Sequence, residues 1–182
     1  MKNKIVILAT LLLSGAAAAH PQVGGAHTHG FFDGFVHPFT GLDHLLAMLA
    51  VGMWSARQSH AKWLPATFIG MLLVGVLTGV AGLTIPGLET GIALTVVLMG
   101  ILIAVAARLP AGVAAMMVGV FALLHGNAHG HELPEVASAG GLLLASALLV
   151  YGGRLGGRVS PALALKLTGA AIAASGAMLV TW

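Results

Sequence analysis

The chain has 182 residues, of which 58% are hydrophobic and only 7% are charged, and its mean hydropathy is +1.00. This composition excludes a soluble globular domain and indicates a protein that crosses a membrane several times. A formal net charge of +3 is too small to indicate a nucleic-acid partner, and the lack of cysteine excludes disulfides and thiolate metal ligands.

The first 19 residues have the features of a secretory signal peptide. Two lysines precede an apolar run over residues 5–13, and the small residues Ala17-Ala18-Ala19 follow it. We expect cleavage after Ala19; the alternative, an uncleaved membrane anchor, is disfavoured by the short apolar run. Cleavage would make His20 the mature N-terminus, where its α-amine and imidazole could together bind a metal ion.

Residues 20–35 follow the expected signal peptide across the membrane, so we expect this segment to be periplasmic. It is polar and contains His27 and His29, whose spacing suits a metal ion on an extended chain. Two histidines in such a segment are a weak signal. Delivery of metal to a main site and simple solvation are equally compatible with them.

Six apolar spans follow within residues 36–182, at 36–54, 63–83, 88–107, 110–130, 136–151 and 161–182. Most approach the ~20 residues with which an α-helix crosses ~30 Å of hydrocarbon. The predicted fold class is therefore all-α, a polytopic membrane protein whose six-helix transmembrane bundle follows the cleaved signal peptide. Glycines such as Gly75 and Gly79 are expected to allow close helix packing.

The charged residues predict the orientation of the spans. With the mature N-terminus outside, every lysine and arginine beyond the signal peptide falls on the cytoplasmic side, whereas every acid falls outside or in the outer half of a span. The charges thus predict that both mature termini lie outside, and we expect the membrane to be a bacterial inner membrane with these termini in the periplasm. The basic residues are Arg57, Lys62, Arg108, Arg154, Arg158 and Lys166, and the acids are Asp33, Asp43, Glu89, Glu132 and Glu135.

A polar motif lies in the first span, where His37 and His44 are seven residues apart. If this span is one helix, the two imidazoles share one face, with Asp43 beside His44. Ionisable groups at membrane depth are energetically expensive and therefore indicate function. Asp43 could be a metal ligand or a group that orients a neighbouring imidazole.

A second polar motif ends the fourth span, where His125, His129 and Glu132 again share one helical face. The rise per residue places both motifs near the outer third of the membrane. We therefore predict one site for a divalent metal ion, to which the mature N-terminus could contribute. The predicted ligands are His37, Asp43, His44, His125, His129 and Glu132, with His20 as the N-terminal addition.

Imidazoles and carboxylates without thiolate suit nickel, cobalt or zinc, and ligand type does not choose among these three. The interleaved glycines Gly41, Gly126 and Gly130 would allow either close helix contact or local unwinding of the backbone around the ion. His131 is expected at the rim of the site, and His60 in a solvated loop.

The patterns His37-x5-Asp43-His44 and His125-Gly126-x-Ala128-His129-Gly130-x-Glu132 resemble the paired signatures of the HupE/UreJ family of nickel and cobalt permeases. The resemblance covers the whole mature chain, with Leu124 in place of the phenylalanine usual before the second motif. It implies uptake of Ni²⁺, with Co²⁺ as a second substrate, for the maturation of hydrogenase or urease.

The leading hypothesis is a secondary permease, not an enzyme, that binds Ni²⁺ (or Co²⁺ or Zn²⁺) as its substrate and holds no prosthetic group. The protein is expected to contact the lipid bilayer, and the sequence is compatible with a homo-oligomer. One alternative is a zinc-dependent intramembrane hydrolase, although the chain lacks a His-Glu-x-x-His helix. Another is a metal-sensing membrane subunit that transports nothing.

Overall fold

The computed structural model describes residues 30–59 and 62–181. The expected signal peptide, the segment with His20, His27 and His29, and the loop residue His60 lie outside the described residues.

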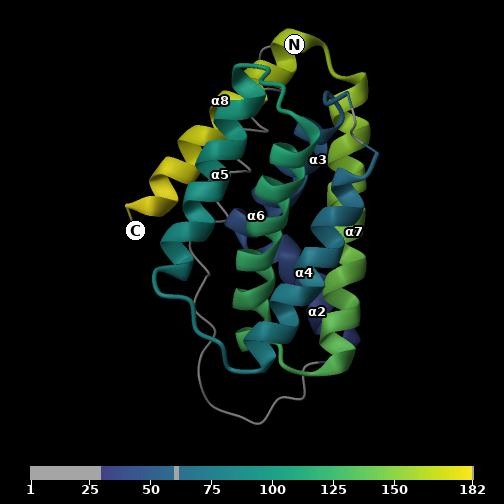
Figure 1. Cartoon of the computed structure of the whole chain (residues 1–182), viewed down its shortest axis with the longest axis vertical. Helices are drawn as coiled ribbons and strands as arrows, with labels where there is room; N and C mark the ends of the chain where they lie inside the picture. The colour runs from purple at the N-terminus through teal and green to yellow at the C-terminus, as the bar shows by residue number, and fades with distance from the viewer. Residues whose placement is uncertain (1–29, 60–61, 182) are drawn as a thin grey trace.

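All regular structure in the described residues is α-helical, which confirms the all-α prediction (Figure 1). From α4 onward, helices that follow one another in the chain run in opposite directions along the long axis of the molecule. The helices are α2 (Phe31–Thr40), α3 (Leu42–Ser55), α4 (Leu64–Val80), α5 (Leu88–Ala104), α6 (Ala111–Glu132), α7 (Val136–Val159) and α8 (Ala162–Val180).

The two ends of this bundle differ in charge. We call the end where α6 stops and α7 begins, at Glu132 and Val136, the histidine end, and the end where α7 stops and α8 begins, at Val159 and Ala162, the basic end. All six basic residues of the described chain belong to helix termini and loops of the basic end, and all five acids lie on the histidine side.

Three helices in the described residues, α6, α7 and α8, are long and apolar enough to cross a membrane. The bent pair α2 and α3 adds a fourth crossing if it is counted as one span. Helices α4 and α5 are apolar but have only 17 residues each. The protein is thus a helical membrane protein.

Four of the predicted spans coincide with single helices to within three residues at each end, namely those of α4, α5, α6 and α8. The predicted end of the fifth span at residue 151 is wrong, because α7 continues to Val159. Its glycines do not end the helix. A Cβ atom on Gly153 would collide with the main-chain carbonyl of Leu49, so this glycine serves close packing of α7 on α3.

The prediction of one continuous first helix is also wrong. Helices α2 and α3 are separated by Gly41 and bend by 82°, so His37 and His44 do not share a helical face. Gly41 has extended backbone angles, with φ −86° and ψ 116°. Helix α3 restarts after it, and the Asp43 carboxylate accepts a hydrogen bond of 2.8 Å from the His44 N–H, which satisfies a donor left free at a helix start.

Glycine pairs bring α4 and α6 into direct backbone contact. A Cβ atom on Gly126 would collide with the Leu72 carbonyl, and one on Gly79 would collide with the Asn127 carbonyl. Because α6 is continuous through this contact, the interleaved glycines of the second motif provide close helix contact and not unwinding. Three further helix pairs also pack backbone to backbone at glycines. These are α3 with α7 at Gly52, Gly153 and Gly157, α2 with α7 at Gly34 and Gly141, and α5 with α8 at Gly100, Gly169 and Gly176.

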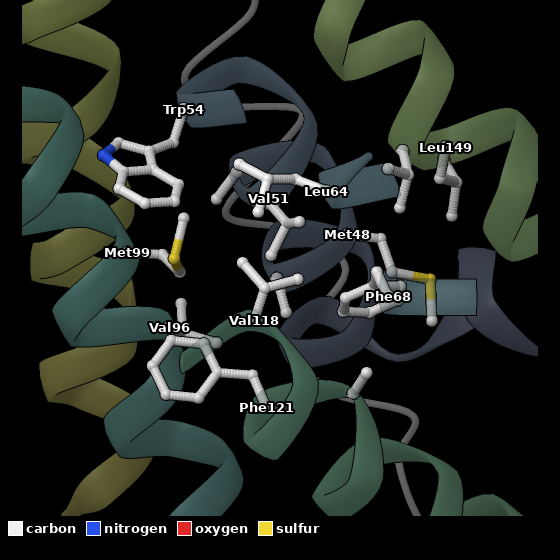
Figure 2. Packing of buried hydrophobic residues seen from close by; sticks show 14 of the residues in the cluster. Met48, Val51, Trp54, Leu64, Phe68, Val96, Met99, Val118, Phe121 and Leu149 are labelled. Carbon is white, nitrogen blue, oxygen red and sulfur yellow. The ribbon is translucent and has the colours of Figure 1, made fainter. Parts of the chain in front are cut away.

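The core between the two ends is apolar and closely packed (Figure 2). Trp54 is buried and donates from its indole nitrogen to the Ala107 carbonyl, at 3.1 Å. Gln58 donates to the same carbonyl at 2.9 Å and accepts from the Leu109 N–H at 3.1 Å. These bonds tie the loop after α3 to the loop after α5 and close the basic end of the core.

Candidate metal centre

The six predicted ligands within the described residues converge on one region at the histidine end. Helix α2 supplies His37, α3 supplies Asp43 and His44, and α6 supplies His125, His129 and Glu132. The imidazoles form a continuous row: ring centroids are 4.9 Å apart for His37 and His129, 4.2 Å for His129 and His44, and 5.1 Å for His44 and His125.

The bend at Gly41 determines how α2 meets α6. His37 Nε2 lies 2.9 Å from the Glu132 carboxylate, a contact that the straight helix assumed from the sequence would not predict. Gly34, one turn before His37, packs directly on the backbone of α7 at Ser138. Close packing of α2 on α7 therefore places His37 beside the last turn of α6.

The more exposed part of the centre consists of His37, His129 and Glu132. One ligand atom from each of these residues lies within 4.8 Å of the others. The side chain of Glu132 is 49% exposed and that of His37 is 32% exposed, whereas His129 is completely buried. This group thus joins the surface of the histidine end to the buried imidazoles.

The more buried part consists of His44 and His125. His125 Nδ1 donates to the Phe121 carbonyl at 2.8 Å, and because a carbonyl oxygen only accepts, the lone pair of a neutral ring is on Nε2. His44 Nδ1 lies 2.9 Å from the Asp43 carboxylate, which favours the same tautomer. Both Nε2 atoms are buried and have no hydrogen-bond partner among the described residues.

His129 lies between these two parts. Its ring is buried and neither nitrogen has a hydrogen-bond partner within the described chain, although Nδ1 is 3.5 Å from the Glu132 carboxylate. Buried polar atoms without partners are rare and energetically costly. Four such imidazole nitrogens occur among the described residues of this cluster; they belong to three rings, and each neutral ring carries a lone pair on one nitrogen. Three such lone pairs in one cluster fit a centre that binds a cation.

Asp43 holds His44 in place. One of its carboxylate oxygens contacts both the main-chain N–H and the ring Nδ1 of His44. Of the two roles that the sequence left open, this geometry favours the orienting one, because a carboxylate on Nδ1 fixes the tautomer that presents Nε2 as a ligand.

Sequence reasoning did not assign Glu89 to the site. It lies in the first turn of α5, within electrostatic range of Asp43, Glu132 and His44. An acid in a first turn is common because it complements the helix dipole, so its position in the sequence carried no signal of a site.

Asn127 was also overlooked, and its role is structural. It is buried on α6 and donates to the Leu83 carbonyl at 2.9 Å and to the Thr78 hydroxyl at 3.1 Å. His131 Nε2 contacts the same Leu83 carbonyl at 3.0 Å. These two residues anchor the loop after α4, and His131 is exposed away from the imidazole row.

Comparison with known proteins gives two matches that cover nearly the whole chain. A family model described as HupE / UreJ protein matches residues 8–179. Protein HupE of Rhizobium leguminosarum bv. viciae is 39% identical over 184 residues, which cover 95% of this chain and 94% of that protein. No solved structure matches the chain. Both histidine motifs lie inside the matched region.

Proposed function

This chain belongs to the HupE/UreJ family of nickel and cobalt permeases, and we propose that it imports Ni²⁺, with Co²⁺ as the second candidate, through the imidazole row at the histidine end. The observation that carries this proposal is the set of buried Nε2 atoms of His44, His125 and His129, which have no partner among the described residues. Neutral imidazoles are good ligands for nickel and cobalt.

Capture of the ion begins at Glu132 and His37. Glu132 is half exposed, so its carboxylate can attract a hydrated cation and replace part of its water shell. His37 and His129 contact this carboxylate from two sides. The first bound position therefore combines one carboxylate with two imidazoles.

Transfer inward follows the row of rings. His129 is next to both His37 and His44, so an ion that leaves Glu132 can keep His129 as a ligand while it gains His44 and then His125. Each step joins rings whose centroids are about 4 to 5 Å apart. Because no step leaves the ion without a ligand, the cost of removing its water is spread along the row.

The structure is closed beyond His125 toward the basic end. Phe121, Val118 and Ala114 continue the same face of α6 and are buried. They belong to the apolar core, which offers a divalent cation no ligands. Import therefore requires that α6 and its neighbours separate below His125, so this conformation represents a stage before inward release.

We further propose six membrane spans, with α2 and α3 as one broken span. Helices α4 and α5, with 17 residues each, reach the lower limit of the ~17–25 residues of membrane helices. Gly41 is half-buried, and the side chains of Asp43 and His44 lie close to it. Non-helical backbone at membrane depth is tolerated where protein covers it or where it lines a cavity. The charges of the two ends support a periplasmic histidine end and an inner-membrane location.

Uptake of radioactive Ni²⁺ by proteoliposomes that contain the purified chain tests the proposed function. We expect uptake by the wild-type protein and background uptake by the double variant His44→Ala/His125→Ala. His131→Ala is the matched control, because it removes an imidazole from the same helix outside the row. Nickel binding without uptake would favour the metal-sensing alternative, and metal-dependent cleavage of a peptide or lipid would favour the hydrolase.

A further inference from the structure

A cavity lined by basic residues lies at the basic end of the bundle, opposite the imidazole row. A cavity of about 380 Å³ opens between the end of α3, the start of α4 and the last turns of α7. Its lining includes three basic residues, Lys62, Arg154 and Arg158, together with Ser59 and Trp63, and none of its lining residues is acidic. The metal site does not account for this cavity.

Two of the three cations, Arg154 and Lys62, have contacts that place them beside the cavity. Arg154 is buried, and its guanidinium donates to the Ser55 hydroxyl at 3.1 Å. Arg158 follows one turn later on the same face of α7, where two like charges repel each other. The Lys62 ammonium lies 5.3 Å from the centre of the Trp63 ring, within the range of a cation–π contact.

The preference for basic residues on the cytoplasmic side explains the sign of these charges. It does not specify the lining of this cavity, in which the three basic residues lie together with the polar side chains of Gln58 and Ser59 and the indole of Trp63. All five Asp and Glu residues lie on the histidine side, and the lining of this cavity contains basic residues and no acid. The charge of the cavity is therefore complementary to an anion.

We propose that this cavity binds the phosphate group of an anionic phospholipid from the leaflet that borders the basic end. Arginine pairs with phosphate through two parallel hydrogen bonds, and lysine contributes a point charge. Trp63 is 67% exposed beside the cavity at the start of α4, in the position of the aromatic residues that lie at headgroup level. Basic pockets between membrane helices are suited to anionic headgroups.

The basic end also contains residues that serve as a control for general charge attraction. A second, smaller cavity of about 220 Å³ at the basic end is lined by Arg57, Arg108 and Lys166 among mainly apolar residues. Arg57 is already bonded to the Ser160 carbonyl, at 2.6 Å. Loss of the charges of Arg108 and Lys166 therefore changes the net charge of this end without changing the proposed site.

The test is lipid binding to the purified full chain in an uncharged detergent, followed by native mass spectrometry. Phosphatidylglycerol, phosphatidylcholine and inorganic phosphate are the three probes. We expect phosphatidylglycerol to bind in preference, and each of Lys62→Gln and Arg158→Gln to weaken its binding about fivefold. Both residues are exposed, so these variants should fold. Arg108→Gln/Lys166→Gln should change the affinity less than twofold.

Three results would overturn the proposal. Equal binding of phosphatidylglycerol and phosphatidylcholine would show that no anionic group is recognised. An equal loss in the control double variant would show general charge attraction and no local site. Displacement of phosphatidylglycerol by inorganic phosphate at similar concentration would indicate a site for soluble anions. None of these results depends on metal transport, so the proposed function is tested separately.

Discussion

Helix α6 contains two contrasting regions, and each has a separate role. Its last two turns present His125, His129 and Glu132 toward α2 and α3, and several of their polar atoms lack partners in the described chain. Its first three turns present Ala114, Val118 and similar residues to a closed apolar core. The last turns of α6 therefore carry groups suited to binding a cation, whereas its first turns are part of an apolar core that would block the passage of a cation.

The region at the histidine end depends on close backbone contact. At the histidine end, Gly126 and Gly130 let α6 lie against α4, and the neighbouring face of α6, about 100° around the helix, presents the imidazoles. In the proposed site, the glycines of the second motif would thus position the ligands without binding the ion. Substitutions in and beside these two regions should differ in their effect on the metal site.

The largest effect is expected from removal of the buried imidazoles. His44→Ala and His125→Ala should each reduce nickel uptake by proteoliposomes to background, because each removes an Nε2 ligand that no neighbour can replace. Protein levels and detergent-solubilised melting temperature serve as controls for folding. Normal uptake by both variants would contradict a role for the buried part of the row.

A smaller loss is expected from Asp43→Asn, which keeps the size of the side chain but removes its charge. We expect nickel affinity to fall roughly 10- to 100-fold, as for other groups that orient a metal-binding imidazole. Calorimetric titration of the purified protein with nickel measures this change. An unchanged affinity would show that the contact between Asp43 and His44 only starts helix α3.

A modest effect is expected from Glu132→Gln at the exposed part of the row. Loss of one exposed carboxylate near a cation removes about 1 kcal/mol of attraction, so the KM for nickel uptake should rise about fivefold. The maximal rate should change less, because the buried ligands remain. A fall in maximal rate with unchanged KM would instead indicate that Glu132 acts in the transfer step.

The smallest effect on nickel binding is expected from Gly126→Ala. The added methyl group would contact the backbone of α4 and none of the proposed ligands. The added methyl group should destabilise the protein by about 1–3 kcal/mol, measured as a lower melting temperature in detergent. Gly112→Ala is the matched control on the same helix, because nothing lies near its Cβ position. Equal melting temperatures for the two variants would contradict the close contact.

The sequence predicted four helices closely, and the histidines that it singled out in two spans lie together in one row, because ionisable groups in apolar spans are conspicuous. Their binding of a metal ion stays a prediction. The sequence did not predict the break at Gly41, since glycines such as Gly52 and Gly75 sit inside continuous helices of the same chain. For the same reason, the glycines at 152 and 153 did not reveal that α7 continues to Val159. Glu89 was overlooked because only tertiary structure brings the first turn of α5 near Asp43 and Glu132.

The proposed site is tested most directly by X-ray absorption spectroscopy of the purified protein loaded with one equivalent of nickel. If the buried imidazoles hold the ion, the spectrum should show a nitrogen-rich coordination shell with the multiple-scattering pattern of at least two imidazoles, and this pattern should be lost in His44→Ala/His125→Ala. A shell of oxygen ligands alone, unchanged in that variant, would contradict the claim that the buried imidazoles hold the ion.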